Sequence, residues 1–582
     1  MRDRLLTLVV LAVLATGCSS SDLSDDPIDG ASEASVPGAP AAMTVVTNAN
    51  VYTVDPAKPW VEAFAYDAKG IIVAVGSRDE VMAAAGTNPT IIDGKGNMVL
   101  PGIQDTHLHV PEAGINNDVC LLDPGLKLND YAKGIKDCVK DQDGAPWVRA
   151  AGASLFNLRT TTGRLPIDVL DEIVPDRPAI ILDDLGHSAW TNTKGLAAAG
   201  IAADAPDPQG GAYFRDASGR MTGLLLENAQ QRVRNASALD DATNYKGLLF
   251  ALKELARNGI TTASDAGGFW GQNHPAAWQK ALDSGTLTVR GVNSLYLYPD
   301  LDHAAQLAEF KTRFADDKQS LLQFDTVKIY IDGILDLGTA AMVDPYDKPV
   351  DPKYPNGFNY FTREQLQQYL NELHTIGYRA EFHVIGDGAV RTALDAVAAI
   401  PVPKDEIVAR RHRTTHTYLV NPADAARFAQ IGVIADFQAG PESAATDYHE
   451  YLTEFIGDRA LDLLPTARII DTGARVSLSS DWDADPLSPF GIISRAVTRE
   501  KNAVKVAKAI AMMTLEAAYA LGQDEITGSI TVGKYADYII IDRSITSVKP
   551  KDIADTKVLL TVLAGRQVHR ADSFKAALTV SD

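Results

Sequence analysis

Short apolar strands alternate with helical segments from residue 99 to residue 480, and this alternation constrains the fold more than any other feature of the chain. Two of the repeats are "YKGLLFALKELARNGITTASDAGG" and "EQLQQYLNELHTIGYRAEFHVIGDG". Strands that alternate with helices form parallel βα units. Counting the strand at 99–109 as the first gives eight strands, which predicts an α/β fold, the (β/α)8 TIM barrel.

The spacing of the barrel strands is interrupted once. His107, near the end of the first strand, lies 154 residues before Thr261, in the second, and one helix cannot fill that interval. Residues 112–240 therefore predict an inserted α/β subdomain that caps the substrate site, which leaves 99–111 and 241–524 for the barrel. The β-branched runs at 43–98 and 525–582 predict a small β-sandwich built from both chain ends.

The first 42 residues predict export. In "MRDRLLTLVVLAVLATGC", residues 1–18, two arginines precede an apolar run and a Gly-Cys pair, as in a bacterial lipoprotein signal peptide whose cysteine, Cys18, carries the lipid. An ordinary signal peptide cleaved near this point is the alternative. Ser19 then favours the periplasmic face of the outer membrane or the cell surface. Residues 19–42 contain no Lys or Arg and predict a disordered acidic tether.

The charge of the chain limits its partners. The 582 residues include 75 acidic and 54 basic side chains, a net charge of −21, which argues against nucleic-acid binding because that requires a basic surface. We expect a small-molecule substrate and contact with a membrane only through the lipid anchor, and a homodimer is left open. Cys120 and Cys138 are the cysteines besides Cys18. In an exported protein they predict a disulfide, with two separate buried thiols as the alternative.

Ionisable residues stand at the ends of several predicted strands, where a barrel places its active site. Four of the eleven histidines fall there, with one lysine and one aspartate. They are His107 and His109 in "QDTHLH", Lys328 in "VKIYIDG", His383 in "EFHVIG", His416 in "RTTHTY" and Asp481 in "SSDW". His107 and His109 share one strand face. Since imidazole and carboxylate are ligands for zinc and similar metals, the set predicts a metal site at the barrel mouth.

These motifs resemble a known family. The stretches "LPGIQDTHLH", "NGITTASDAG", "VKIYIDG", "FHVIGDGAV", "SSDWDADPLSPFGIISRAVTR" and "GSITVGKYADYIIID" are together similar to the amidohydrolase superfamily of metal-dependent hydrolases. Within it, the chain resembles the branch of N-substituted formamide deformylase (YtcJ-like proteins, amidohydrolase family 3). The resemblance covers nearly everything after the tether.

The resemblance implies one or two divalent metal ions, with zinc as the expected metal. The ligands would be His107, His109 and Asp481 for the first ion, and His383 and His416 for the second. Lys328 would be carboxylated by carbon dioxide and bridge the two ions, because a lysine carbamate is an anionic oxygen ligand whereas an ammonium cannot bind a cation. A buried lysine has the lowered pKa that carboxylation needs. Asp481 would take a proton from water and pass it to the leaving nitrogen.

The insertion carries a second motif of this branch. The stretch "DDLGHSAWTNTKGL" matches the family pattern Gly-His-x-x-Trp-x-Asn, which implies that His187, Trp190 and Asn192 lie over the barrel mouth and contact the substrate. A capping turn for a helix that starts near Asn192 is the alternative. Asp332, four residues after Lys328, shares its strand face if the strand continues, and it is a further candidate for contact with the metals or the substrate.

The chain departs from the branch pattern in the loops above the metals. Gly338 stands where the family has arginine, and Asp483 and Ala439 stand where it has proline. The metal site is therefore better defined than the substrate. We expect hydrolysis of a carbon–nitrogen bond that is not a peptide bond, such as an N-acyl or N-formyl amide. The alternatives are a deaminase, lactonase or cyclic-imide hydrolase on the same site, or a non-catalytic substrate-binding lipoprotein.

Overall fold

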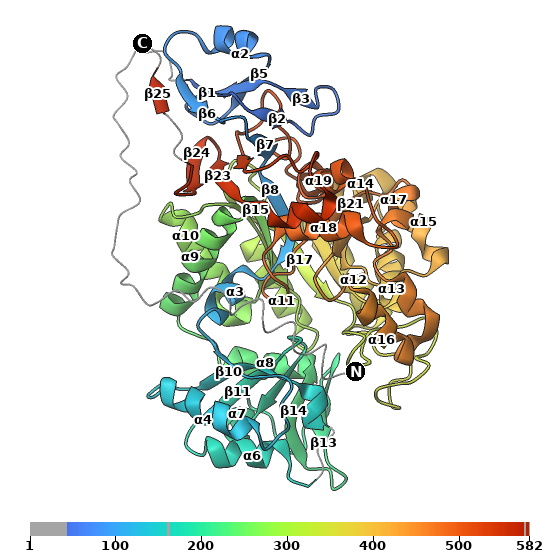
Figure 1. Ribbon diagram of the computed structural model, residues 1–582. Coiled ribbons are helices and arrows are strands. Elements are labelled where there is room, and N and C mark those ends of the chain that lie inside the picture. The colour runs from blue at the N-terminus through green and yellow to red at the C-terminus, as the bar shows by residue number, and fades with distance from the viewer. Residues whose placement is uncertain (1–42, 160–162, 575–577, 581–582) are drawn as a thin grey trace.

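The computed structural model describes residues 43–159, 163–574 and 578–580 (Figure 1). The predicted signal peptide, the tether and Cys18 lie outside these residues. Among the described residues, no helix is long and apolar enough to cross a bilayer. In Figure 1 the small sandwich lies at the top, the barrel in the middle and the insertion at the bottom.

Eight parallel strands form the barrel sheet, in the order β8, β15, β16, β17, β18, β19, β20 and β21. Their bounds are β8 (Ile103–Leu108), β15 (Ile260–Gly268), β16 (Arg290–Tyr296), β17 (Leu322–Tyr330), β18 (Arg379–Val384), β19 (Arg413–His416), β20 (Ile434–Gln438) and β21 (Val476–Ser479). The N–H of Asp481, just after β21, donates to the carbonyl oxygen of His107 in β8 at 2.9 Å, which links the two edge strands. The prediction of a TIM-barrel fold is confirmed.

Helices cover the outside of the barrel because each presents one apolar face. They include α9 (Asp241–Arg257), α10 (His274–Asp283), α11 (His303–Arg313), α12 (Arg363–Ile376), α13 (Asp387–Ala398), α15 (Pro422–Ile431), α17 (Thr466–Asp471) and α18 (Pro489–Thr498). In α12, Thr362 and Gln365 form a capping box that fixes the first turn. Leu366, Leu370 and Leu373 are buried at helical spacing on its inner face.

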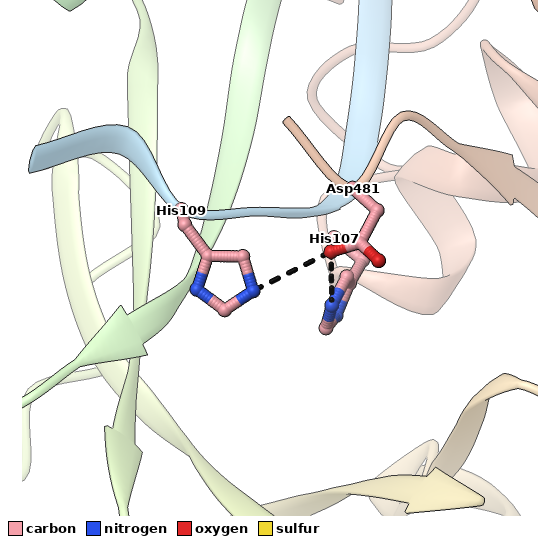
Figure 2. Close-up of side chains that lie close together, drawn as sticks. All are labelled: His107, His109 and Asp481. Atoms are coloured by element: carbon pink, nitrogen blue, oxygen red, sulfur yellow. Dashed lines mark ion pairs between the residues drawn. The ribbon is translucent and has the colours of Figure 1, made fainter. Parts of the chain in front are cut away.

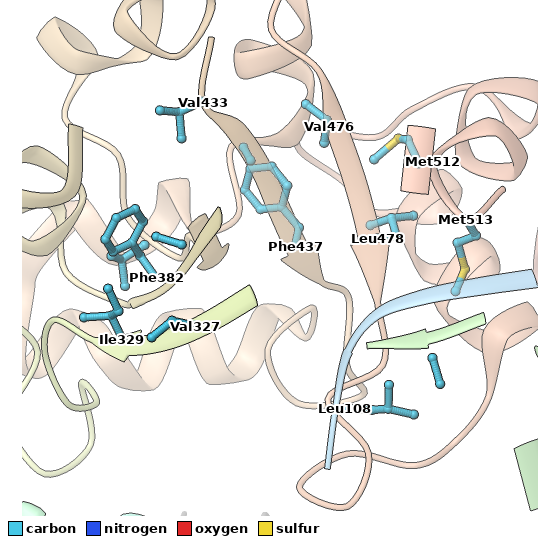
Figure 3. Packing of buried hydrophobic residues seen from close by; sticks show 14 of the residues in the cluster. Leu108, Val327, Ile329, Phe382, Val433, Phe437, Val476, Leu478, Met512 and Met513 are labelled. Atoms are coloured by element: carbon cyan, nitrogen blue, oxygen red, sulfur yellow. The ribbon is translucent and has the colours of Figure 1, made fainter. Parts of the chain in front are cut away.

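The barrel strands are buried along their length. Every residue of the eight strands is buried except Tyr330, the last residue of β17. Figure 3 shows Phe382, Phe437 and Leu478 of three strands in one apolar cluster with Met512. This rigid core fixes the strand ends, where the predicted ligands stand.

The chain enters the insertion by way of α3 (Val110–Asn116), which follows β8. Helix α3 packs directly on barrel helix α9, so closely that a Cβ on Gly114 would lie 1.8 Å from the carbonyl oxygen of Gly247. The insertion has its own mixed sheet, in the order β13 (Gly211–Arg215), β14 (Met221–Glu227), β12 (Ser188–Thr191), β11 (Ala179–Asp183), β10 (Val148–Ala153) and β9 (Cys120–Leu121). A disulfide between Cys120 and Cys138 joins β9 to α4 (Tyr131–Asp141).

The sandwich joins both chain ends. One sheet has the order β25 (Leu578–Val580), β6 (Thr90–Asp93), β1 (Thr44–Thr47), β4 (Ala63–Tyr66) and β5 (Ile72–Gly76), and the other β24 (Arg566–Arg570), β23 (Val558–Leu563), β22 (Tyr538–Ile541), β7 (Met98–Pro101), β2 (Asn50–Tyr52) and β3 (Trp60–Val61). Gly102 separates β7 from β8, and a Cβ there would meet the Thr261 hydroxyl at 2.1 Å. The chain thus passes straight from sandwich to barrel.

Candidate active site

The strand-end residues converge at the barrel mouth that faces the insertion. His107, His109 and Asp481 each offer one ligand atom, and these atoms lie within 4.8 Å of one another. Figure 2 shows one oxygen of the Asp481 carboxylate joined by dashed lines to a nitrogen of each of the two imidazoles. His107 lies inside β8, while His109 follows the strand end and starts α3. The pair is therefore presented by the end of a strand and the turn that follows it.

One carboxylate faces three imidazoles. Asp481 Oδ1 lies 3.2 Å from His107 Nε2 and 3.4 Å from His109 Nε2, and Oδ2 lies 3.6 Å from His416 Nδ1. Burial alone would raise the pKa of Asp481, but His107 and its neighbours hold it well below its ordinary value. Asp481 is therefore an anion at neutral pH, with its oxygens turned to the centre of the group.

His383 and His416 complete the ring of imidazoles. Their centroids are 4.4 Å apart, and His416 lies 4.8 Å from His107. Burial and neighbouring cationic groups lower the pKa of both His383 and His416 well below the ordinary value, so both keep a free lone pair. Both ring nitrogens of His383 are buried and have no hydrogen-bond partner among the described residues. Unpaired buried polar atoms of this kind fit a metal ion as their missing partner.

Lys328 lies beneath the imidazoles. Its side chain is fully buried, with Nζ 3.3 Å from His107 Nδ1 and 3.7 Å from Glu381 Oε1. Burial lowers the pKa of Lys328 to about 8. Near neutral pH a lysine with that pKa has a much larger neutral fraction than an exposed lysine, and the neutral amine is the nucleophilic form.

Glu381 supports this group and was missed by the sequence analysis. Its Oε1 lies 2.5 Å from His107 Nδ1, and its Oε2 accepts from Arg413 at 2.5 Å and from Ser294 at 2.8 Å. Burial alone would raise the pKa of Glu381, but Arg413 and Lys328 hold it far below its ordinary value. A carboxylate on one imidazole nitrogen orients the other nitrogen. The signal was present, because Glu381 precedes His383 by two residues and so shares its strand face.

His109 has a comparable support, also missed. Its Nδ1 lies 3.2 Å from Glu112 Oε2, and Glu112 pairs with Arg234 of α8 (Gln231–Ala236), in the insertion. Burial alone would lower the pKa of His109, but the carboxylates of Asp481 and Glu112 raise it to about 10. His109 therefore carries a proton that a metal ion would displace.

Asp332 is placed beside His383, with Oδ1 3.5 Å from His383 Nδ1. Its carboxylate accepts three backbone N–H groups, from Ala341, Ile385 and Gly386, at 2.8–3.0 Å. The side chain is fully buried. These contacts make it an anchor for the loops after two strands, rather than a group open to the substrate.

The insertion motif is split between the site and its own core. The ring of His187 lies 5.2 Å from that of His383 and 5.9 Å from that of Tyr330, so His187 reaches the barrel mouth. The structure corrects the prediction for the other two residues. Trp190 is buried inside the insertion against Tyr131, because residues on β12 alternate between the two faces of their sheet.

Asn192 caps a helix, which was the alternative to contact with the substrate. Its Oδ1 accepts from the N–H groups of Gly195 and Ala179 at 2.8 and 3.0 Å, and its Nδ2 donates to the carbonyls of Val174 and Arg177. All hydrogen-bonding capacity of the amide is used within the insertion. Asn192 therefore fixes the start of α7 (Thr193–Ala198) and cannot contact a substrate at the same time.

The backbone conformation explains why glycine stands at position 338. Its φ of 68° lies in the left-handed region, and a Cβ there would lie 2.8 Å from Cβ of Val350. A side chain of any length is strained at this position. The loop after β17 therefore takes a course that an arginine at position 338 would disfavour.

These features define a barrel hydrolase with a histidine and aspartate site of the metal-binding type. The chain matches the Amidohydrolase family over residues 90–569 and belongs to that family. The resemblance to N-substituted formamide deformylase is confirmed: that enzyme of Arthrobacter pascens is 26% identical, with 90% of this chain and 97% of the enzyme covered. The protein LONG AFTER FAR-RED 3 of Arabidopsis thaliana is also 26% identical, with 92% of each chain covered.

A solved structure supports the fold. The crystal structure of an uncharacterized metal-dependent hydrolase from Pyrococcus horikoshii superposes with a TM-score of 0.68 at 20% identity, covering 88% of this chain and 99% of that one. At this level of identity the likeness concerns the fold, since one fold hosts many functions.

Proposed function

We propose that the protein is a metal-dependent hydrolase of a carbon–nitrogen bond other than a peptide bond, with an N-acyl or N-formyl amide as substrate. The observation that carries this proposal is the convergence of ligand atoms from His107, His109 and Asp481 within 4.8 Å, at the C-terminal mouth of the barrel. The similarity of the chain to the N-substituted formamide deformylase of Arthrobacter pascens supports the choice of bond.

The donor set fits divalent metal ions, because both buried nitrogens of His383 have no hydrogen-bond partner among the described residues and the Asp481 carboxylate faces three further imidazoles. His107, His109 and Asp481 would hold one ion, and His383 and His416 a second. Lys328 would bridge them as its carbamate, with carbon dioxide as a second cofactor. A bound ion such as zinc supplies Lewis acidity and lowers the pKa of a bound water to about 7.

The protein side chains supply the rest of the chemistry. The carboxylate of Asp481 is an anion that faces three imidazoles. It would accept a proton from water and return it to the leaving nitrogen. Glu381 and Glu112 orient His107 and His109. Burial lowers the pKa of Lys328, which favours the neutral amine that carbon dioxide requires.

The export route is part of the same proposal. A lipid on Cys18 and a tether over residues 19–42 would hold the hydrolase at the periplasmic face of the outer membrane or at the cell surface, where a small-molecule substrate reaches it. Mass determination of the protein from membranes tests this point, because a lipidated N-terminus adds the mass of its acyl chains.

The substrate proposal is tested by a panel of N-formyl amides, N-acyl amides, cyclic imides, amino-purines and lactones, offered to metal-loaded protein. Turnover confined to the two acyclic amide classes is expected, with Asp481→Asn as the blank. Turnover confined to an amino-purine, a cyclic imide or a lactone would replace the proposal by the corresponding alternative. Binding without turnover of any class would favour a substrate-binding lipoprotein.

A further inference from the structure

Glu227, the last residue of β14, is a buried carboxylate on which three side chains converge. His187 Nδ1 lies 2.7 Å from Oε2, Tyr360 donates its hydroxyl to Oε2 at 2.5 Å, and Thr339 donates its hydroxyl to Oε1 at 2.5 Å. Glu227 is 1% exposed. Its backbone has φ 53° and ψ −128°, a conformation that non-glycine residues rarely adopt and that tends to mark functional sites.

The barrel makes room for this carboxylate. Thr339 and Tyr360 lie in the barrel segment between β17 and α12, so Glu227 joins the insertion to the barrel. Gly333 lies in the same segment, and a Cβ there would lie 2.1 Å from Glu227 Oε1. Gly333 is the glycine of "VKIYIDG". This glycine leaves the space that the side chain from the insertion occupies.

The contact decides which nitrogen of His187 carries a proton. A carboxylate only accepts hydrogen bonds, so Nδ1 must be the protonated nitrogen. Nε2 has no hydrogen-bond partner among the described residues, and the His187 side chain is 14% exposed to solvent. Because the ring lies 5.2 Å from His383 and 5.9 Å from Tyr330, Nε2 is left for a partner at the barrel mouth.

We propose that Glu227 is a positioning residue that fixes the Nδ1–H form of His187 and so directs Nε2 to the polar group of the substrate beside His383 and Tyr330. This inference rests on the proposed function for the identity of the substrate. The insertion then supplies a side chain to the reaction in addition to covering the barrel mouth, and the carboxylate that orients that side chain is held by hydroxyls of the barrel.

Nitrogen-15 NMR of ring-labelled histidines tests the hydrogen-bonding claim without a substrate. The His187 signals are assigned by their loss in His187→Gln. We expect a protonated Nδ1 in the wild-type protein and a shift of both His187 nitrogens in Glu227→Gln, because the amide can donate to Nδ1. Tyr360→Phe is the matched control, since it removes the other hydrogen bond to Oε2 but keeps the carboxylate, and its His187 shifts should match wild type. Unchanged shifts in Glu227→Gln, or equal shifts in both variants, would overturn the proposal.

Gly333→Ala provides a second route if Glu227→Gln does not fold, because the added methyl group displaces the carboxylate without changing its charge.

With a substrate from the panel, Glu227→Gln should lower kcat about 10- to 100-fold, as for other carboxylates that orient histidines, with a smaller change in KM. Wild-type kcat in Glu227→Gln would remove the positioning role. A wild-type protein that cleaves no substrate but shows the expected NMR shifts would refute the proposed function and leave the role of Glu227 standing.

Discussion

Two carboxylates of the barrel, one buried and one partly exposed, have opposite surroundings. Asp436, in β20, accepts hydrogen bonds from neutral groups only: Thr106 at 2.6 Å, Ser477 at 2.7 Å, Ser479 at 2.5 Å, Gln438 at 2.9 Å and Thr415 at 3.1 Å. Asp481, at the mouth, faces three imidazoles, and the buried nitrogens His109 Nδ1 and His383 Nδ1 and Nε2 in the same group have no hydrogen-bond partner among the described residues. Saturation marks the first carboxylate as structural, whereas the unmet bonds around the second mark the reactive end of the barrel.

The two carboxylates differ in the free energy of folding that their surroundings cost. A buried polar atom without a partner lowers the stability of the fold by about 1–3 kcal/mol. His383 leaves two such atoms among the described residues, while the carboxylate oxygens of Asp436 are fully used. At His383, a metal ion or a polar group of the substrate could complete these unmet bonds.

The largest expected effect is the loss of turnover in Asp481→Asn. The amide cannot take the proton from water, so we expect kcat/KM to fall by about 10³-fold or more, at the upper part of the range for general acid–base groups. Initial rates on the best panel substrate measure the loss. Asp436→Asn is the comparison variant and should lose far less activity, so an equal loss in both would erase the distinction between the two carboxylates.

The second effect is on bound metal. His383→Asn should lower the divalent metal retained after gel filtration, because it removes a ligand with free nitrogens. His412→Asn is the matched control: His412 lies before β19, and its Nδ1 accepts the N–H of Ala380 at 3.0 Å. Elemental analysis should find wild-type metal in His412→Asn. Retention of wild-type metal in His383→Asn would contradict its role as a ligand.

The third effect is on stability. Asp436→Asn places an amide among five donors, so at least one donor loses its acceptor. We expect the free energy of unfolding to fall by about 2–3 kcal/mol, the usual cost of an unsatisfied buried group near a lost charge. Urea denaturation followed by circular dichroism measures it. Unchanged stability would show that the five hydrogen bonds do not hold the barrel interior together.

The smallest effect concerns acid pH. Burial alone would raise the pKa of Asp325, but Arg379 at 2.7 Å and Lys318 at 2.8 Å lower it. A lowered folded-state pKa means that the pair stabilises the protein above the ordinary carboxyl pKa of about 4 and loses this contribution as pH falls below it. Asp325→Asn should therefore flatten the decline in stability, about 1–2 kcal/mol, from pH 5 to lower pH. Parallel declines in both proteins would rule Asp325 out as the source.

The candidate ligands could be proposed from the sequence because each stands at or near the end of a strand in the order that a barrel requires. The spacing could place Glu381 on the strand face of His383, but it could not show which residues the orienting groups contact, because these partners come from distant parts of the chain. Glu381 meets His107 across 274 residues, and Arg234 meets Glu112 across 122. Such contacts depend on closure of the barrel and docking of the insertion, which no local pattern records.

The insertion motif also shows that a sequence pattern alone does not predict which side chains reach the barrel mouth. A short pattern places Trp190 and Asn192 near His187 in the sequence, but alternation along β12 turns Trp190 into the core of the insertion. The capping signal at Asn192 was readable, and four hydrogen bonds bear it out. Choosing between cap and substrate contact required the position of the insertion relative to the barrel.

The proposed hydrolase activity requires a metal site, and metal binding by the purified protein tests that site most directly. Elemental analysis by mass spectrometry of protein as isolated, after chelation, and after reloading with zinc, manganese or iron should show one or two ions per chain that are lost and regained. The His107→Asn, His383→Asn double variant should bind none. A wild-type protein that carries no metal and takes up none would contradict the account.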